Sequence, residues 1–393
     1  MSYGSGVFES TQVWLEIDEP SRTAAWQSSR ALGDAASQWN GYLNRLCVQA
    51  VQGWLQEDYG APAAVVPNAA ALPSFWELVN GTAIALAGRR LILIPSEAID
   101  ADELRVPQEW VDIPNWLGDY YLAVQVNEDE GWVRLNGFAT HRQLKQQGHY
   151  DWRDRTYSLA DSELIADFGV LWVSQQLAPQ EATRATVPNL AALPIAQAEN
   201  LIERLSHPSL INPRLAIPFA TWGALVGHGG WRQRLAERRQ GLPEQRSLLQ
   251  WLRSDLSDWA QQAGWGQVAF QPSAAGARGD QLGADAGGIA LSRRLEIAEQ
   301  PYELLITPAD TAGRVWRFTL RSLVTGGSIP AGFVLRLLTE DLQPFEGNED
   351  RAEAAIDSLF IEVALEPDEG IVWEVEPAPE GYDREILNLA GLP

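Results

Sequence analysis

The sequence predicts a multidomain α+β protein. It comprises an N-terminal α+β domain with antiparallel hairpins (residues 1–176), a helical middle segment (177–270), a flexible Gly/Ala-rich loop (271–288) and a C-terminal antiparallel β-sandwich (289–393). The length of 393 residues exceeds what one hydrophobic core usually serves. The apolar pattern changes along the chain from mixed periods, to a helical period, to strict alternation. An apolar share of 46% with 17 tryptophans excludes a disordered chain.

The clearest helix of the first domain covers residues 37–60. Apolar side chains recur there at spacings of three and four, Ser37 can cap the start, and Gly60 can end it. The run AIALAGRRLILI then predicts two short strands around Gly88, and Pro95 is expected to end the second strand. Because the strands come in such pairs, we expect antiparallel pairing.

A stronger hairpin signal lies in the run YYLAVQVNEDEGWVRLNGF. Its alternating apolar residues predict two strands that flank a turn from Asn127 to Gly131. Thr140 and Gln143 then have the spacing of a capping box, which predicts a short helix that Gly148 ends. Residues 161–176 are expected to form one further helix.

The middle segment begins with residues 177–192, whose composition is that of a linker. Helical periodicity then predicts four helices, at 194–205, 219–226, 231–239 and 244–262. Glycines before the third of these fit a hinge between helices. Its arginines form a basic face that we expect to contact the acidic sandwich of the same chain or a partner: Arg232, Arg234, Arg238 and Arg239.

The C-terminal part alternates apolar and polar residues, most clearly at 315–320, 361–366 and 371–376, which predicts the strands of a sandwich. Residues 340–385 carry sixteen carboxylates against two arginines, a net charge of −14 within a chain whose net charge is −23. The preceding stretch, 314–339, has arginines and no acid, so cross-strand Arg–Glu pairs are expected, each worth about 0.2–1 kcal/mol. These arginines are Arg314, Arg317, Arg321 and Arg336.

Four arginines cannot cancel fourteen charges, so the sequence predicts a net acidic face on the sandwich. Such a face repels nucleic acid and anionic membranes and favours a basic protein partner. The first functional hypothesis is therefore a non-enzymatic regulatory protein that docks a basic partner, such as a transcription factor. The residues expected to make this contact are Glu346, Asp350, Glu362, Glu366, Glu374 and Glu376.

A dense polar cluster lies in the run HRQLKQQGHYDWRDRTY, between His141 and Tyr157. It offers an alternative function, an enzyme or a small-molecule or metal sensor, because His and Asp together can bind metal or transfer protons. The two histidines are eight residues apart and no third ligand has a recognised spacing. An ion-pair and turn network is therefore favoured for these residues, which are His141, His149, Asp151, Arg153, Asp154 and Arg155.

Several classes of protein are excluded or disfavoured. A single cysteine, Cys47, rules out an intrachain disulfide framework and a cysteine-based zinc site, and fits a reducing compartment. We find no leader peptide and no apolar run of eighteen residues, so a cytoplasmic protein without membrane contact is expected. Nucleophile-elbow, dinucleotide, zinc-protease and calcium-loop motifs are missing, so we predict no catalytic residue, metal ion or cofactor.

Four segments resemble an uncharacterised cyanobacterial family, domain of unknown function 1822. They are FWELVNG, YYLAVQVNEDEGWVRLNGFATHRQLKQQGHYDWRDRTYSL, NLIERLSHPSLINPRLAIPFATWGAL, and the run from LRLLTEDLQPFEGN to IVWEVEPAPEGYDREIL. The resemblance covers nearly the whole chain and supplies no residue roles. It implies a cyanobacterial cytosolic protein in a regulatory setting, since such proteins are similar in context to regulators that act with alternative sigma factors. A sigma factor or another regulator is then the implied kind of partner.

Overall fold

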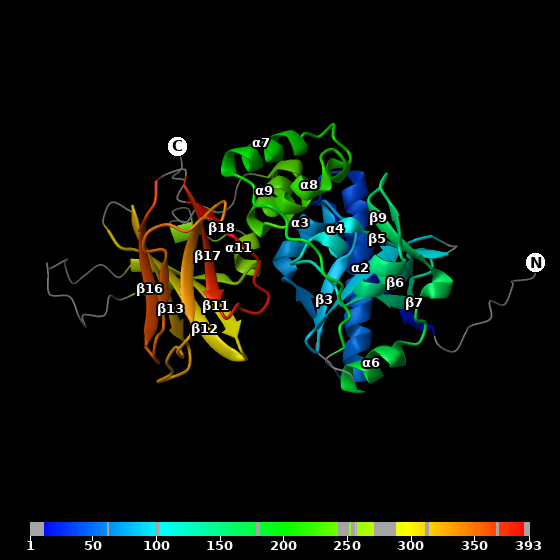
Figure 1. Ribbon diagram of the computed structural model, residues 1–393, viewed down its shortest axis with the longest axis horizontal. Helices are drawn as coiled ribbons and strands as arrows, with labels where there is room; N and C mark the ends of the chain where they lie inside the picture. The colour runs from blue at the N-terminus through cyan, green and yellow to red at the C-terminus, as the bar shows by residue number, and fades with distance from the viewer. Residues whose placement is uncertain are drawn as a thin grey trace, which may run out of the picture. The chain divides into compact units, whose positions relative to one another are not determined.

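The computed structural model forms two compact units, Met1–Leu242 and Pro243–Pro393, shown as a ribbon in Figure 1. The predicted boundaries at 176/177 and 270/271 do not coincide with this division, because the helices between 195 and 239 pack within the first unit. The residues described are 12–60, 63–98, 102–177, 181–242, 251–252, 256, 258–270, 288–310, 314–366 and 369–388.

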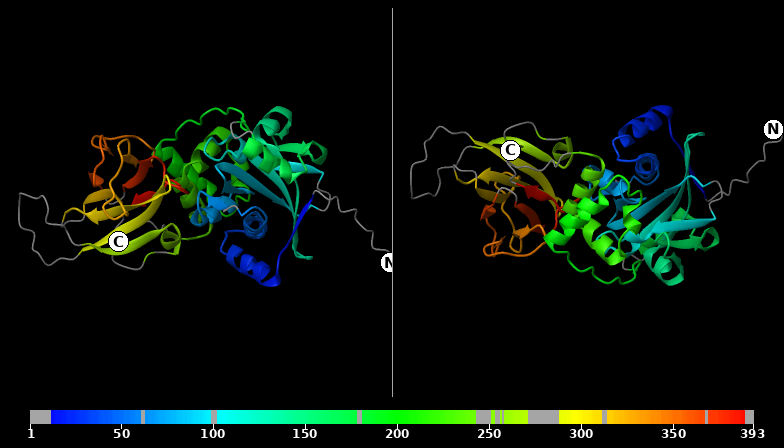
Figure 2. Two further views of the ribbon diagram at one scale, coloured as in Figure 1. Left: turned by 90° about the horizontal axis from the view of Figure 1, so that it is seen from below. Right: turned by 90° about the horizontal axis from the view of Figure 1, so that it is seen from above.

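The described part of the first unit contains a mixed six-stranded sheet, one face of which packs against a long helix, α2 (Ala35–Tyr59). Figure 2 views α2 almost end-on beside the sheet. Burial of Cys47 in the shared core raises the pKa of its thiol, so this cysteine is an inert core residue. Across the sheet the strands are β1 (Val13–Glu16), β7 (Trp132–Thr140), β6 (Tyr120–Asn127), β4 (Arg89–Ser96), β3 (Thr82–Leu86) and β2 (Ala64–Val66).

The predicted helix at 37–60 is confirmed, with a correction at its start. Gly60 adopts a left-handed conformation (φ 59°) and ends the helix as expected. The N-cap is Asp34, whose carboxylate accepts a hydrogen bond of 2.9 Å from the backbone N–H of Ser37. A shorter helix, α1 (Glu19–Ser29), precedes it and packs against it.

The two predicted hairpins are also confirmed, as β3–β4 and β6–β7. Strand β4 does not end at Pro95 but continues to Ser96. The expected antiparallel pairing is confirmed within each hairpin, but β4 and β6, which belong to different hairpins, run parallel. The segment between them, which includes β5 (Glu103–Pro107) and α4 (Gln108–Asp112), is long enough to cross back and start the next strand in the same direction.

A three-stranded antiparallel sheet of described residues lies beside α5 (His141–Gln147); its order is β5, β9 (Thr156–Ala160), β8 (His149–Asp151). The Thr140 hydroxyl caps α5 by accepting from the N–H of Gln143 at 3.1 Å, and Gly148 ends the helix. The capping box is only half formed, because the Gln143 side chain donates to the carbonyl of Glu163 instead.

The single helix predicted at 161–176 is wrong in its first half. A 3-10 turn, η2 (Asp161–Glu163), is followed by an extended stretch, and α6 begins only at Phe168 (Phe168–Leu177). The backbone N–H and carbonyl of Ile165 are both bonded to Phe138 of β7, at 2.9 and 3.0 Å. These bonds replace the ones that a helix would need there.

Three further helices of the first unit lie close to the predicted positions: α7 (Ile195–Leu205), α8 (Phe219–Val226) and α9 (Gly229–Arg239). Three short helices of this unit were not predicted: η1 (Ala69–Ala71), α3 (Leu72–Trp76) and η3 (Pro213–Leu215). Helix α9 packs on α3, α7 and α8. None of the helices among the described residues is long and apolar enough to cross a lipid bilayer.

The arginines of α9 were expected to contact the acidic sandwich or a partner, but two of them are used inside the first unit. The guanidinium of Arg232 is buried over the ring of Phe75, 3.9 Å from its centre, and its Nε donates to the Ser74 hydroxyl at 3.0 Å. Arg239 forms ion pairs with Glu77 and Asp34, at 3.0 and 2.9 Å. This face is therefore largely internal.

The second unit contains two antiparallel sheets of described residues and the short helix α11 (Asp258–Gln262). The predicted strands at 315–320, 361–366 and 371–376 are confirmed as β13, β16 and β17. Most of the predicted helix 244–262, and loop residues 271–287, lie outside the described residues. One sheet has the order β10 (Trp265–Phe270), β11 (Gly288–Ile297), β12 (Gln300–Pro308), β13 (Val315–Ser322), β16 (Ser358–Ala364); the other has β15 (Glu349–Arg351), β14 (Val334–Thr339), β17 (Gly370–Glu376), β18 (Ile386–Asn388).

Candidate functional site

Arginines of the C-terminal sheets pair with acids on neighbouring strands. Arg317 of β13 lies directly opposite Glu362 of β16, and their Nη2 and Oε1 atoms are 2.6 Å apart. Arg336 of β14 has acidic neighbours on both sides, since its strand pairs with β15 and β17. Its guanidinium lies within 3.0–4.0 Å of the carboxylates of Glu349, Glu374 and Glu376. Two of the four arginines expected to pair with the acidic stretch, Arg317 and Arg336, therefore do so. Arg321 pairs instead with Glu303 of β12.

Because of this pairing, only some of the six residues expected to contact a partner protein are free of an ion pair to the part of the chain that the structure describes. Glu362, Glu374 and Glu376 are held by arginines. The carboxylate of Asp350 accepts a hydrogen bond of 2.9 Å from the backbone N–H of Phe360. Only Glu346 and Glu366 of the six are exposed without an ion pair among the described residues.

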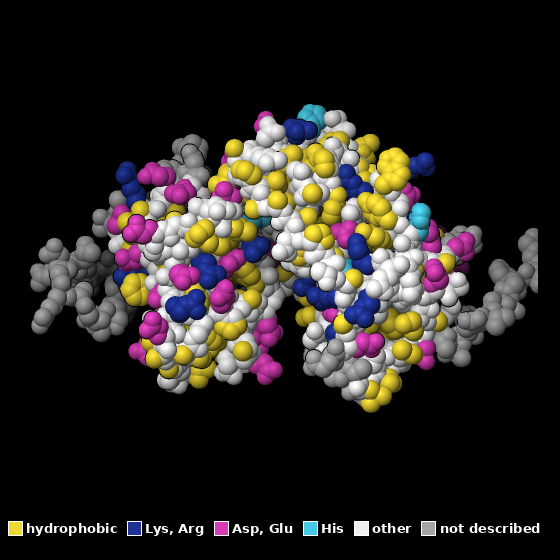
Figure 3. Space-filling view, in the orientation of Figure 1, with side chains coloured by type: hydrophobic (Ala, Val, Ile, Leu, Met, Phe, Trp, Pro, Cys, Tyr) yellow, Lys and Arg dark blue, Asp and Glu magenta, His cyan; other side chains and the backbone are white. Residues whose placement is uncertain are grey.

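Four other acids of the 340–385 stretch are likewise exposed and without an ion pair among the described residues. Together with Glu346 and Glu366 they form a set that we call the unpaired carboxylates, each exposed and without an ion pair to any described residue. On the face of this unit that Figure 3 views, acidic side chains are dispersed with basic side chains between them and do not form one continuous patch. The unpaired carboxylates are Glu346, Glu353, Asp357, Glu366, Glu369 and Glu380.

Two acids of the 340–385 stretch are buried, Glu340 (7% exposed) and Glu385. Glu385 is 4% exposed and forms an ion pair with Arg293, which is 5% exposed. The indole N–H of Trp265 donates to the other carboxylate oxygen of Glu385 at 2.9 Å. Burial lowers the pKa of Arg293 to about 10, which still leaves its guanidinium protonated at neutral pH. Counting carboxylates in the sequence thus overstates the surface charge.

His141 of the polar cluster is fully buried and has a structural role. Its Nδ1 accepts a hydrogen bond of 2.9 Å from the backbone N–H of Ala185, so the ring proton is on Nε2, which donates to the carbonyl of Val111 at 2.8 Å. Burial lowers the pKa of the imidazole, which keeps the ring neutral. His141 therefore holds the predicted linker against α4 and has no free nitrogen for a metal.

The pH dependence of stability tests this assignment. The pKa of His141 is lowered in the folded protein, whereas an unfolded histidine titrates near 6.5, so below that pH the unfolded chain binds one more proton. The contribution of His141 to the free energy of unfolding should therefore be complete above pH 6.5. It should decrease as the pH falls below 6.5, by at most about 1.4 kcal/mol per pH unit. We expect the change in melting temperature between pH 7.5 and 5.5 to be smaller in a His141→Gln variant than in the wild type.

The matched control is His149→Gln, because His149 is exposed and its replacement leaves the buried imidazole of His141 in place. The control should keep the pH dependence of the wild type. Equal pH dependence in the wild type and in His141→Gln would contradict a buried neutral imidazole.

The remaining cluster residues form an ion-pair and turn network. Arg105 of β5 binds Asp154, with Nη2 and Oδ2 2.5 Å apart, and lies 3.9 Å from Asp151. The guanidinium of Arg155 donates at 2.5 Å to the backbone carbonyls of Arg214 and Ile217. These contacts fix the loop between β8 and β9 and join it to the segment before α8.

Arg153 and His149 are the exposed members of the cluster. The guanidinium of Arg153 lies over the ring of the neighbouring Trp152, 5.8 Å from its centre. His149 opens β8 and faces a cavity described below. The six clustered residues thus do not converge on one reacting centre.

Glu109 is a buried charge that sequence analysis missed. It is completely inaccessible, accepts two hydrogen bonds from Arg214 at 2.8 and 2.7 Å, and accepts a third from the indole N–H of Trp222 at 2.8 Å. Its partners lie more than 100 residues away in sequence, so no local motif marks it. Its role is to fix η3 and α8 against α4.

Asp119 is a second buried acid that ties the predicted linker to the first unit. Burial alone would raise the pKa of its carboxyl, but hydrogen bonds from Arg184, Thr183 and the backbone N–H of Arg90 together hold the pKa below its ordinary value. The Thr183 hydroxyl is 2.6 Å from Oδ1, and Nη2 of Arg184 is 2.7 Å from Oδ2. The stretch predicted as a linker is thus anchored at two points, by Asp119 and His141.

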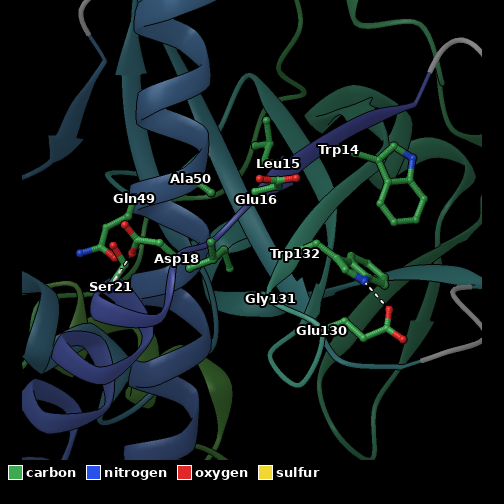
Figure 4. Close-up of a pocket in the computed structure, with 11 residues that line it drawn as sticks. Trp14, Leu15, Glu16, Asp18, Ser21, Gln49, Ala50, Glu130, Gly131 and Trp132 are labelled. Atoms are coloured by element: carbon green, nitrogen blue, oxygen red, sulfur yellow. Dashed lines mark hydrogen bonds between the residues drawn. The ribbon is translucent and has the colours of Figure 1, made fainter.

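Two cavities are found among the described residues of the first unit. The first, of about 860 Å³, lies along β1, where the rings of Trp14 and Trp132 are 4.7 Å apart. Figure 4 shows this ring pair and Glu130 on one side of the strand and Gln49, Ser21 and Asp18 on the other. The hydrogen bonds marked in the figure join lining residues to one another: the Trp132 indole N–H donates to Glu130, and the Ser21 backbone N–H donates to Asp18. Its polar groups do not converge on a common point.

The second cavity, of about 760 Å³, lies between the β4, β6 and β7 strands and the three-stranded sheet. Of the six predicted cluster residues, His149 alone lines it. The cavity also contains Asn136, a residue to which sequence analysis assigned no role. No group of three His, Cys, Asp or Glu side chains within the described ranges is arranged to hold a metal ion.

The fold and the sites define a mixed α+β protein. Its described residues place charged pairs across β-strands, and two cavities lie in its first unit. The chain belongs to the family described as a protein of unknown function, DUF1822, whose model matches residues 15–388. This confirms the family that the sequence resembles. No curated protein and no solved structure matches the chain significantly.

Proposed function

We propose that this chain is a non-enzymatic regulatory protein of the cyanobacterial cytoplasm whose C-terminal unit docks a basic protein partner. The partner class is a sigma factor or another transcriptional regulator, which presents a basic DNA-facing surface. One observation carries the proposal: six carboxylates of residues 340–385 are exposed and have no ion pair among the described residues. Exposed charges of one sign accelerate encounter with a partner of the opposite sign.

The proposal includes a β-sandwich as the docking scaffold. Arg293 of β11, in one sheet, lies 5.2 Å from the ring centre of Trp373 of β17, in the other sheet. Both side chains are buried, as are Trp316 and Phe318 of β13. A core shared between two sheets is the arrangement of a sandwich, which leaves the outward residues of each strand in solvent.

Neutralising the unpaired carboxylates tests the proposal. The variant carries Gln or Asn at all six positions, and binding is measured by capture from a cyanobacterial lysate at low salt with identification by mass spectrometry. We expect the wild type to capture specific basic proteins, and the variant to lose them, because the contact is electrostatic. Raising the salt concentration should release the same proteins from the wild type, since ions screen exposed charges.

The control variant has the same change in net charge in the other unit. It replaces six exposed acids that also lack ion pairs among the described residues: Glu57, Asp58, Asp161, Glu181, Glu199 and Glu203. This variant should keep the partners of the wild type. Equal loss of partners in both variants would assign binding to whole-chain charge, and capture of no basic protein would reject the proposal.

A second candidate function is small-molecule sensing by the N-terminal unit. The cavity beside His149 supports it, because ligand sites are concave and of about 300–1,000 Å³. A ligand that binds only the folded state raises its melting temperature, which gives a direct screen.

A further inference from the structure

The cavity beside His149 contains an unusual feature of strand β7. Gly137 pairs with Ala123 of β6 and Leu135 pairs with Val124, so Asn136 has no partner residue in the ladder. Asn136 is therefore the extra residue of a β-bulge. Such bulges redirect a side chain, and here the redirected side chain is one that lines the cavity.

The side chain of Asn136 is buried without satisfying its acceptor. The residue is 8% exposed, and its Oδ1 has no hydrogen-bond donor among the described residues. A buried polar atom that lacks a partner costs about 1–3 kcal/mol. The bulge thus holds the Asn136 amide inside a cavity with its oxygen unpaired. That oxygen can accept a hydrogen bond from a molecule that enters the cavity.

The charge around Asn136 limits what that molecule can be. The cavity is lined by three acids, Asp102, Glu103 and Glu163, and by one cation, Arg105. Hydrogen bonds to Glu103 and Asp154 raise the pKa of Arg105, and its nitrogens lie 2.7 and 2.5 Å from those carboxylates. The single cation is thus already paired, so an anionic ligand would meet net repulsion.

The rest of the lining combines apolar and polar surface. The lining includes the apolar residues Ile94 and Ala123 and the polar residues Ser158 and Gln147. A few polar groups over an apolar surface are typical of sites that orient small polar ligands.

We infer that this cavity binds a small polar ligand, neutral or cationic, that donates an N–H or O–H hydrogen bond to Oδ1 of Asn136. The inference rests on the second candidate function and names the ligand class of that site. It is independent of the acidic C-terminal unit.

The test uses the full-length chain and two series of probes; the members of each series share one scaffold and carry different charges. The sugar series is glucose, glucosamine and glucuronate, and the nucleoside series is adenosine and adenosine 5′-monophosphate. Binding is measured by isothermal titration calorimetry and by the shift in melting temperature. We expect a neutral or cationic member to bind and its anionic counterpart to bind at least about ten-fold more weakly, which corresponds to about 1.4 kcal/mol.

Asn136→Leu removes the acceptor and keeps a branched side chain of suitable size for the cavity. We expect it to weaken binding of the same probe about ten-fold or more. Its melting temperature without ligand should equal or exceed that of the wild type, because no unpartnered oxygen remains buried. A purely structural asparagine would instead lower the melting temperature when it is replaced.

Asn388→Leu is the matched control. Oδ1 of Asn388, in β18 of the other unit, is likewise buried without a donor among the described residues. This variant should bind the probes as the wild type does. Equal binding by Asn136→Leu, or preferred binding of the anionic probe, would overturn the inference while leaving ligand sensing in place. Binding of no probe at millimolar concentration would reject ligand sensing itself.

Discussion

Replacing Glu109 with alanine is expected to lower the free energy of unfolding of the N-terminal unit by about 3–5 kcal/mol. The side chain of Glu109 is inaccessible, and that of its partner Arg214 is 12% exposed. Removing the carboxylate leaves the guanidinium of Arg214 buried without its counterion, and the indole N–H of Trp222 loses its acceptor. The cost comes from these stranded groups, because a desolvated charge without a partner is very unfavourable.

The measurement is differential scanning calorimetry of the full chain at neutral pH. A loss of this size should lower the melting temperature of the affected transition by about 10 °C. The double variant Glu109→Leu/Arg214→Met should recover most of the loss, because well-packed apolar residues often replace a buried ion pair at little cost.

The control for Glu109 is Glu103→Ala. Glu103 also pairs with an arginine, Arg105, but both side chains are about 40% exposed. Solvent screens such a pair, so its loss should cost less than about 1 kcal/mol. If the two single variants are destabilised equally, burial is not what gives the Glu109 pair its importance.

Replacing Glu385 with alanine should destabilise the C-terminal unit by a similar amount, about 3–5 kcal/mol. Arg293 would remain buried, between the rings of Trp265 and Trp373, whose centres lie 5.6 and 5.2 Å from its guanidinium carbon. Because Arg293 already has a pKa lowered to about 10 by burial, removing Glu385 should lower it further. Chemical unfolding followed by tryptophan fluorescence measures the change directly, since two indoles flank the site.

Glu380→Ala is the control in the same unit. Glu380 belongs to the same acidic stretch but is exposed and has no ion pair among the described residues. Its replacement should change stability by less than about 0.5 kcal/mol. Comparable losses in Glu380→Ala and Glu385→Ala would mean that Arg293 does not depend on its carboxylate partner.

The N-cap of α2 cannot be identified from the local sequence alone. Ser37 and Asp34 are both suitable capping residues, and the apolar period does not distinguish them. The carboxylate of Asp34 also binds Arg239, at 2.9 Å, from a helix about 200 residues further along the chain. That contact favours Asp34, and it is invisible in any local window.

In the polar cluster, too, the role of each residue depends on partners that are distant in sequence. The density of His, Asp and Arg between His141 and Tyr157 is visible in the sequence, and the interpretation as an ion-pair and turn network follows from it. The decisive partners are distant: Ala185 for His141, and Arg214 and Ile217 for Arg155. Because of these contacts, His141 is a buried structural residue and not a candidate for catalysis.

The sequence around Asn136 contains a local signal for the β-bulge. An Asn-Gly pair interrupts an otherwise apolar strand, and Gly inside a strand often marks a bulge. The signal indicates the bulge but not its consequence. Only the position of β7 beside β6 and the three-stranded sheet places the redirected amide in a cavity.

The sequence by itself determined the α+β class, the two hairpins, the α2 helix and the alternating C-terminal strands. Hydrophobic period, caps and turns act over a few residues, so they can be recognised locally. Only the tertiary structure decided that β4 and β6 run parallel, that the supposed linker is anchored by Asp119 and His141, and which carboxylates remain unpaired. The physical reason is that charge pairing and burial depend on residues brought together from distant parts of the chain, and these contacts leave no periodic trace in the sequence.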